Sequence, residues 1–330
     1  MLYYPGWGAA TLSVSDDGIF VGQKGNNAFK FTTAANSAVN LPHLSALNVS
    51  AAMAINPQGD GPTPNPGENY RYIVGSSRHA TGVDRPVVWW GGSATPTDLV
   101  NAGVSIVAAD GKGLATGVND VGEVVGWAEL KVGTGTAKAT RAFRSRAADF
   151  LNALPLVAGD ELLPLGSQTD VNNLAVAWAI GANNIAVGGS IVKVVNTLTT
   201  NAVFWTARNG VSANPVASKL LDLPSRPVIG GQSEATAINY DTTPPGNAGY
   251  NRSYIGGWSF DGTTNRATLW RGVSTTVPPL DLNDQHFAYR GTSWWLETIE
   301  AINNSKAMVG TGWFNGKRRG YLLVPLTPGN

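Results

Sequence analysis

A short pattern that occurs six times constrains the fold of this chain more than any other feature. Each copy has a turn rich in Asn or Asp, then a strand with a Val-Gly or Ile-Gly pair, then a strand that carries an aromatic residue. A repeat of this size indicates one supersecondary module per copy, and such a module cannot bury its hydrophobic face without a neighbour. The Gly residues at this strand position in the six copies are Gly22, Gly75, Gly126, Gly188, Gly256 and Gly310.

Six modules of this kind predict an all-β protein, a six-bladed β-propeller with about four antiparallel strands per blade. The 40 Gly residues and a charged fraction of 14% agree with a turn-rich β protein. The last repeat lacks a fourth strand, so we expect residues 1–7 to supply it and to close the ring, which leaves no strand edge exposed. We expect one domain over residues 1–330, with repeats at 8–45, 46–108, 109–170, 171–228, 229–290 and 291–330.

The recurring Asn and Gly residues have different local roles. Asn favours turns because its side chain bonds to nearby backbone groups and tolerates left-handed dihedral angles. Gly weakens a strand unless another group approaches it closely, so the strand Gly residues predict tight packing between blades rather than ligand sites. Short fourth strands are expected at residues 97–99, 221–223 and 280–282, where Asp98, Asp222 and Asp281 recur and are expected to be structural.

The composition argues against several classes of protein. The chain has no Cys, so it has neither disulfides nor a thiol nucleophile. Its net charge of +1 argues against a nucleic-acid partner, because such proteins gather Lys and Arg on one face. No apolar run reaches the ~18 residues of a membrane span, so we expect no membrane insertion. His43, His79 and His286 lack the spacing of a metal site, and we expect neither a metal nor a cofactor.

The C-terminal repeat resembles one known family. Residues 280–283 read Leu-Asp-Leu-Asn, residues 308–310 read Met-Val-Gly, and residues 319–325 read Arg-Gly-Tyr-Leu-Leu-Val-Pro. This stretch resembles the final repeat of the HAF-repeat proteins, which are bacterial extracellular repeat proteins. The resemblance implies export or display at the cell surface, and it transfers no catalytic residue. The first residues of the chain do not read as a signal peptide.

Three carboxylates outside the repeat template are the candidate catalytic residues. Glu234, Glu297 and Glu300 precede the Asn turns of the fifth and sixth repeats, in segments expected to form first strands. First strands line the central channel of a propeller, where two carboxylates can act as general acid and general base in glycoside cleavage. The alternative is that these side chains pair with Arg or are simply solvated.

Tryptophan is the second unusual feature, since the template accounts for only Trp89, Trp205 and Trp270 among 11 residues. Exposed rings on a rigid scaffold stack on sugar faces or anchor protein partners. The alternative is that the remaining rings cap the blade cores. Three Trp residues follow a strand Gly by one to three positions, and two others neighbour a second Trp. These five candidate ligand-binding residues are Trp127, Trp258 and Trp313, with Trp90 and Trp294.

The sequence favours an exported or surface-displayed binding or scaffold module that recognises a polysaccharide or another envelope or matrix component. The first alternative is a hydrolase or lyase that acts on an extracellular polymer through channel carboxylates. The second is a structural subunit of a surface assembly, with a protein partner. All three stay open, because the chain contains no nucleophile elbow or other motif that decides between them.

Overall fold

The computed structural model describes residues 9–16, 18–32, 37–57, 72–90, 95–100, 110–132, 137–145, 156, 160–167, 169–194, 197–206, 214–223, 232–239, 253–284 and 293–325. These residues form strands and turns and contain no α-helix. The chain divides into two compact units. The first holds residues 1–163, 169–171 and 210–214, and the second holds residues 164–168, 172–209 and 215–330.

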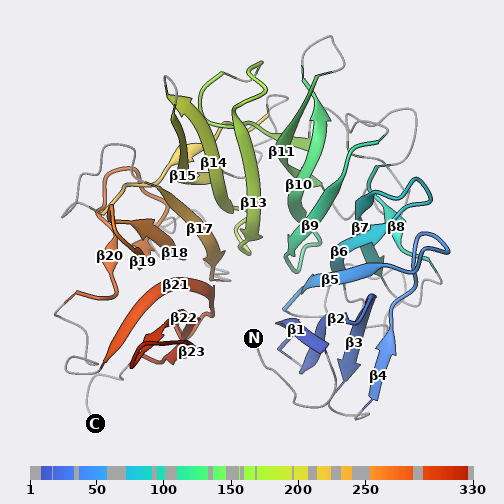
Figure 1. Ribbon diagram of the computed structural model, residues 1–330, viewed down its shortest axis with the longest axis horizontal. Helices are drawn as coiled ribbons and strands as arrows, with labels where there is room; N and C mark the ends of the chain where they lie inside the picture. Colours follow the sequence, from blue (N-terminus) through green and yellow to red (C-terminus); the bar gives the residue numbers. More distant parts are fainter. Residues whose placement is uncertain are drawn as a thin grey trace. The chain divides into compact units, whose positions relative to one another are not determined.

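The first unit contains three four-stranded antiparallel sheets, in which strands that follow one another in the chain also pair (Figure 1). The first sheet has β1 (Ala9–Val14), β2 (Ile19–Lys24), β3 (Asn27–Thr32) and β4 (Ser37–Asn40). The second has β5 (Ser50–Ile55), β6 (Tyr72–Arg78), β7 (Asp84–Trp90) and β8 (Thr97–Asp98). The third has β9 (Gly113–Val118), β10 (Val124–Lys131), β11 (Lys138–Ser145) and β12 (Glu161–Leu162).

The second unit has two four-stranded sheets and one three-stranded sheet with the same antiparallel order. The first sheet has β13 (Leu174–Ile180), β14 (Ala186–Val194), β15 (Thr197–Trp205) and β16 (Ser218–Lys219). The second has β17 (Ser233–Ile238), β18 (Tyr254–Phe260), β19 (Asn265–Arg271) and β20 (Leu280–Asp281). The third has β21 (Trp294–Ile302), β22 (Met308–Phe314) and β23 (Lys317–Leu323).

These sheets confirm the predicted fold class, an all-β protein with the six blades of a β-propeller. Each sheet lies within one predicted repeat, and we number the blades 1 to 6 in chain order. Within the described residues, β23 pairs only with β22. Its expected partner, residues 1–7, lies outside the described residues, so closure by the N-terminal segment stays a prediction.

The Asn turns join the first and second strands of a blade, as predicted. The side-chain oxygen of Asn56 accepts the backbone N–H of Tyr72 at 2.8 Å, and that of Asn239 accepts the N–H of Tyr254 at 2.6 Å. Both Asn residues are buried, and each side chain satisfies a backbone donor at the start of the second strand. Asn119 and Asn303 make the same bond in blades 3 and 6.

A bulge in the first strand explains the strand Gly. In blade 2 the register shifts between Ala52 and Ala54, and the carbonyl oxygen of Ala51 lies 1.9 Å from the place of a Cβ on Gly75. The prediction of packing between blades is therefore wrong here, because the crowding group belongs to the same blade. A first-strand carbonyl crowds the Cβ position in the same way at Gly126, Gly188, Gly257 and Gly310.

Blade 5 differs from the template by one residue. Gly257, not Gly256, takes the position beneath a first-strand carbonyl, that of Glu234 at 2.0 Å. Gly256 does face a neighbouring blade, because the side chain of Ile299 in blade 6 lies 2.5 Å from its Cβ position. At Gly256, therefore, the predicted packing between blades is confirmed.

Ion pairs join the third and fourth strands of three blades. Arg85 pairs with Asp98 at 2.8 Å, and Arg266 pairs with Asp281. These contacts confirm a structural role for Asp98 and Asp281. In blade 3 the equivalent pair is Arg141 with Glu161, at 3.2 Å.

Blade 4 departs from this pattern. Its fourth strand is β16 at Ser218–Lys219, so the expected strand at 221–223 is wrong by about three residues. Lys219 pairs in register with Val203, where Asp98 pairs with Val87 in blade 2. The charge at this position is therefore reversed, and Lys219 binds Asp222 at 2.7 Å instead of a third-strand Arg.

Apolar contacts between neighbouring blades form the core of each unit. In the first unit, Val74 of blade 2 lies in one buried cluster with Phe143 of blade 3. The template Trp adds a polar contact, because the indole N–H of Trp89 donates to the carbonyl of Pro42 in the preceding blade at 2.8 Å. Trp270 makes the same bond in the second unit. As a result, the first strands of consecutive blades in one unit lie next to each other.

Candidate functional site

One carboxylate of the second unit is flanked by two aromatic side chains. Glu234 lies on β17, the first strand of blade 5, and its Oε1 accepts the indole N–H of Trp178 at 2.6 Å. Trp178 comes from β13, the first strand of blade 4. Trp258, on β18, lies opposite Glu234 in the strand register, so the two side chains lie on the same face of the sheet. All three residues are partly exposed, so solvent reaches the group.

A Gly on the neighbouring blade leaves room for this carboxylate. A Cβ on Gly189 of β14 would lie 2.7 Å from Oε1 of Glu234. Gly189 directly follows the crowded Gly188, just as Trp258 directly follows Gly257. Gly189 and Trp258 therefore occupy the same repeat position in blades 4 and 5. The small residue leaves space for the carboxylate of Glu234, and the large one lies opposite Glu234 in the strand register.

Glu300 adds a second negative charge. It is the extra residue of a bulge in β21, the first strand of blade 6, and it is exposed. Its Oε1 accepts the hydroxyl of Thr298 at 2.7 Å. Strand β17 contacts both β13 and β21, so three adjacent first strands supply the group. We call Trp178, Glu234, Trp258 and Glu300 the Glu234 cluster.

The electrostatics of the cluster oppose ionisation of its central residue. Burial raises the pKa of the Glu234 carboxyl above its ordinary value, and the charge of Glu300 raises it further. The N–H donors of Trp178 and Trp258 act in the opposite direction, because they stabilise the carboxylate. Burial is the dominant effect, so Glu234 holds its proton to a higher pH than an exposed Glu.

The third candidate carboxylate, Glu297, has different surroundings. Its Oε1 accepts the indole N–H of Trp313 at 2.8 Å, and its Oε2 accepts Nε–H of Arg318 at 2.9 Å. Both oxygens are thus bonded within blade 6. Trp313 is 42% exposed, and Glu297 holds its ring in place at the surface. This arrangement matches the alternative of a carboxylate paired with Arg.

The described contacts of the other candidate Trp residues do not include Glu234. Trp127 lies on β10 in the first unit, opposite Leu114. Trp294 packs against Phe314 and Tyr321, with ring centroids 5.0 and 6.4 Å apart. Trp90 ends β7, and its side chain lies outside the described residues. Of the five candidates, Trp258 lies opposite Glu234 in the strand register, and Trp313 donates a hydrogen bond to Glu297.

The sequence pattern does not single out Trp178. Its place is created by the bulge in β13, where the register shifts between Ala177 and Ala179. A bulge inserts one residue and breaks the alternation that sequence reasoning uses. The signal that finds Trp178 is its distance from the strand end: it precedes the last residue of β13 by two positions, as Glu300 does in β21.

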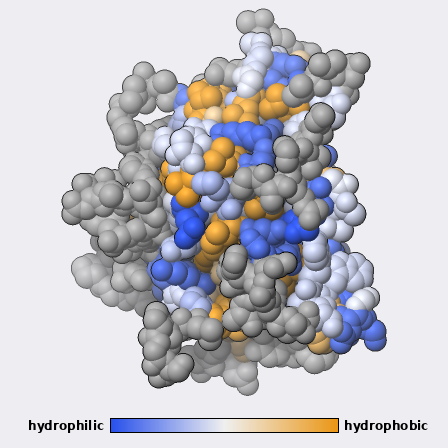
Figure 2. Space-filling view, turned by 90° about the vertical axis from the view of Figure 1, so that its left-hand side faces the viewer, coloured by the Kyte–Doolittle hydropathy of each residue, from blue (hydrophilic) through white to orange (hydrophobic). Residues whose placement is uncertain are grey.

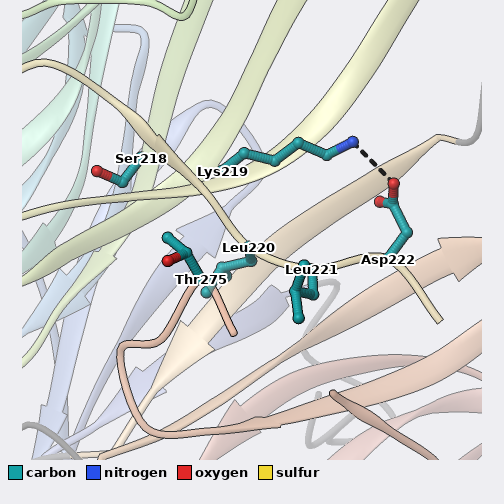
Figure 3. A pocket seen from close by; sticks show the side chains of 6 residues that line it. All are labelled: Ser218, Lys219, Leu220, Leu221, Asp222 and Thr275. Atoms are coloured by element: carbon teal, nitrogen blue, oxygen red, sulfur yellow. Dashed lines mark hydrogen bonds and ion pairs between the residues drawn. The ribbon is translucent and has the colours of Figure 1, made fainter. Parts of the chain in front are cut away.

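A pocket of about 410 Å³ lies at another place in the second unit (Figure 3). In it, Lys219 forms an ion pair with Asp222, so its two charges neutralise each other. The pocket contains none of the candidate residues. Its lining is Ser218, Lys219, Leu220, Leu221, Asp222 and Thr275.

The histidines have local hydrogen-bond partners. His43 bonds the hydroxyl of Ser50 at 3.0 Å, and His79 bonds that of Thr81 at 3.1 Å, whereas His286 lies outside the described residues. Within the described ranges, no three His, Cys, Asp or Glu side chains gather as metal ligands would. In the same ranges we find no helix with the length and hydropathy to cross a membrane.

Figure 2 shows one face of the molecule coloured by hydropathy. Hydrophobic and hydrophilic residues are interspersed over the coloured part of this face.

The sequence matches no protein-family model and resembles no curated protein. The likeness of the C-terminal repeat to the HAF-repeat proteins therefore stays a prediction, as do the location and function that it implies.

Proposed function

We propose that this protein is a binding module that recognises a polysaccharide through the Glu234 cluster. One observation carries the proposal: Glu234 accepts a hydrogen bond from Trp178 and lies opposite Trp258 in the strand register, and all three residues are partly exposed. Sugar rings have apolar faces that stack on aromatic rings and hydroxyl groups that donate to carboxylates. We further propose, from the resemblance of the last repeat, that the protein acts outside the cell or at its surface.

The support for this reading is that the cluster is built on strands. Trp178, Glu234 and Glu300 lie on three adjacent first strands, and the side chain of Trp178 is oriented by its hydrogen bond to Glu234. Aromatic side chains held in one orientation lose little entropy when a ligand binds. A rigid, partly exposed group of this kind suits a ligand that is bound and released unchanged.

Binding is tested by affinity electrophoresis and titration calorimetry of the full chain against a panel of neutral, acidic and cationic polysaccharides. We expect retention by at least one polymer and a loss of about tenfold or more in the Trp178→Ala variant. Retention that is unchanged in this variant would contradict the assignment of the site. Neither retention nor turnover by any polymer would favour a structural subunit of a surface assembly.

A second candidate function is hydrolysis of the bound polymer. Burial and the charge of Glu300 raise the pKa of Glu234, which is the direction that a general acid in glycoside cleavage requires. Product analysis of the same mixtures separates the two functions, because a binding module releases no oligosaccharides. If products appear and persist unchanged in both Glu234→Gln and Glu300→Gln, these carboxylates are not the catalytic pair.

A further inference from the structure

Strand β23 of blade 6 has no neighbour on one of its two edges within the part of the chain that the structure describes. It pairs with β22 along its whole length, from Lys317 opposite Phe314 to Leu323 opposite Met308. Each of the other five sheets has a fourth strand beside the third. The exposed edge of a strand offers backbone N–H and C=O groups that an added strand can bond. The completed blades therefore show which kind of strand fits beside β23.

Three completed blades pair an Arg of the third strand with an acidic residue of the fourth. In blade 2, Arg85 lies two positions before Val87, and Asp98 lies opposite Val87. Arg85 then reaches Asp98 at 2.8 Å, with only 7% of the Arg side chain exposed. The fourth strand thus neutralises an Arg that its own backbone helps to bury. The pairs with the same register in blades 3 and 5 are Arg141 with Glu161 and Arg266 with Asp281.

Blade 6 has the third-strand Arg without a described acidic partner. Arg319 lies two positions before Tyr321 and opposite Gly312, which is the register of the third-strand Arg in the other blades. It is exposed, and none of the ion pairs among the described residues includes it. Its neighbour Arg318 points to the other face of the strand and binds Glu297. Arg319 therefore marks the place of an acidic residue that a fourth strand would bring.

A buried Leu follows the acidic residue of the fourth strand. Leu99 follows Asp98, and its backbone N–H donates to the carbonyl of Pro86 at 3.1 Å. Its side chain is fully buried in one cluster with Val88 of the third strand. The residue of β23 that corresponds to Val88 is Leu322, which is 64% exposed. The edge of β23 thus presents an apolar side chain beside its unmatched cation. The corresponding buried Leu residues in blades 3 and 5 are Leu162 and Leu282.

We propose that the edge of β23 binds an extended segment of a partner protein in which an acidic residue is followed by Leu. The segment adds to blade 6 as a fourth antiparallel strand, with its carboxylate on Arg319 and its Leu beside Leu322. The N–H of this Leu donates to the carbonyl of Gly320, which corresponds to the acceptor in blade 2. Residues 1–7 contain no Asp or Glu, so they do not supply this charge. The interaction is separate from the proposed polysaccharide site.

The charges around Arg319 favour the same partner. Lys317 and Arg318 are exposed beside it, and three consecutive cations attract an acidic segment. The charge of Arg318 is matched by Glu297 within blade 6. Arg319 is therefore the cation that selects the acidic residue, whereas the backbone of β23 supplies bonds to any extended segment.

The test measures the binding of two synthetic peptides to the full chain by titration calorimetry. The first has the sequence of residues 276–283, Thr-Val-Pro-Pro-Leu-Asp-Leu-Asn, which includes the fourth strand of blade 5, and both of its ends are blocked. The second has Asn in place of the Asp. We expect the first peptide to bind about tenfold more tightly or more, because only its carboxylate pairs with Arg319. Arg319→Gln removes this difference, whereas Lys317→Gln, at a second exposed cation of the strand, keeps it.

Hydrogen exchange of the backbone amides locates the bound peptide. The N–H and C=O of one strand residue point to the same edge, so the amides of Gly320 and Leu322 face the added strand and are expected to exchange more slowly. Failure of the first peptide to bind, equal binding of the two peptides, or protection that spares β23 would overturn the inference. A difference that survives Arg319→Gln, or that Lys317→Gln removes equally, would do the same. Polysaccharide binding is expected to be unchanged in Arg319→Gln, so the two proposals fail separately.

Discussion

Trp178 donates its indole N–H to Glu234 at 2.6 Å across the boundary between blades 4 and 5. Hydrogen bonds to an ionised acceptor are roughly twice as strong as those between neutral groups. This bond, together with the space left by Gly189, fixes the carboxylate at a partly exposed place. The packing of blade 4 against blade 5 therefore sets the position of the carboxylate in the proposed binding site.

The raised pKa of the partly buried Glu234 carboxyl makes the stability of the protein depend on pH. Its folded pKa is raised above the ordinary value of 4.5, so the folded state holds the proton longer than the unfolded state does. Stability is therefore greatest at and below the ordinary pKa and falls as pH rises through the folded pKa. We expect Glu234→Gln to unfold at a temperature equal to or above that of the parent protein at neutral pH.

Thermal unfolding of both proteins over a series of pH values measures this effect. Glu161→Gln is the control, because burial also raises the pKa of Glu161 but its carboxylate is paired with Arg141. That change removes the negative charge that pairs with the buried guanidinium of Arg141 and is expected to destabilise the protein by about 3–5 kcal/mol. A loss of stability in Glu234→Gln that grows with pH would contradict the assigned sign.

The crowded Gly residues predict a sharp contrast between two substitutions. A Cβ on Gly188 would lie 1.9 Å from the carbonyl oxygen of Val176, so Gly188→Ala requires a shift of backbone. On Gly320 the nearest atom is 3.8 Å away, so Gly320→Ala is accommodated. We expect chemical denaturation to show a loss of several kcal/mol, on the order of 3 or more, only for Gly188→Ala. Similar losses for the two variants would refute the bulge explanation.

The Asn side chains that bond the turn backbone are expected to contribute more to stability than exposed polar residues in the turns. Asn239→Ala leaves the backbone N–H of Tyr254 without its acceptor at a buried place, which costs about 1–3 kcal/mol. Asn304, which is exposed in the turn of blade 6, is the comparison, and its change to Ala is expected to cost less than about 0.5 kcal/mol. Equal costs in urea titrations would show that the turn bond contributes little.

The ion pairs of Arg266 predict a loss of stability that depends on pH. Burial would raise the pKa of Asp261, but bonds from Arg266 and from the backbone of Thr263 and Thr264 lower it to about 2. The contribution of Asp261 is therefore complete above its ordinary value of 3.8 and is lost as pH falls toward about 2. Arg266→Met should destabilise strongly near neutral pH and much less near the lower end of this window. A cost that stays constant down to that end would exclude this pairing.

The N-terminal segment provides a test of ring closure. Strand β23 pairs only with β22 among the described residues, and an unpaired strand edge is a liability that proteins cover. If residues 1–7 supply the missing strand, deletion of residues 1–6 lowers the melting temperature clearly. Deletion of residues 326–330 is the control and should have a small effect. An unchanged melting temperature in the first variant would reject closure by this segment.

Much of the fold follows from the sequence because its signals are local. The bond from Asn239 to the backbone of Tyr254 depends on a single turn, and the strand before Gly188 is defined by its own hydrophobic residues. Glu234 and Glu300 both lie on first strands, as their distance from the Asn turns predicts. Their placement required only the repeat template.

The site itself is less predictable, since it depends on bulges and on contacts between blades. Trp178 reaches Glu234 because a bulge in β13 interrupts the alternation of side chains, and no sequence pattern marks the bulge directly. The bulge in β17 is not marked by the sequence either, and for this reason the template selects Gly256, whereas the glycine beneath the first-strand carbonyl is Gly257. Trp127 and Trp258 look equivalent in sequence, but only Trp258 faces a carboxylate across its strand pair.

The most direct test of the account is therefore the affinity of the Trp258→Ala and Trp127→Ala variants for the polysaccharide that the parent protein binds most tightly, measured by titration calorimetry. The two residues occupy the same repeat position, one opposite Glu234 and the other opposite Leu114. The account predicts a loss of about tenfold or more for Trp258→Ala and an affinity close to that of the parent protein for Trp127→Ala. Equal losses, or no loss in Trp258→Ala, would contradict the Glu234 cluster as the binding site.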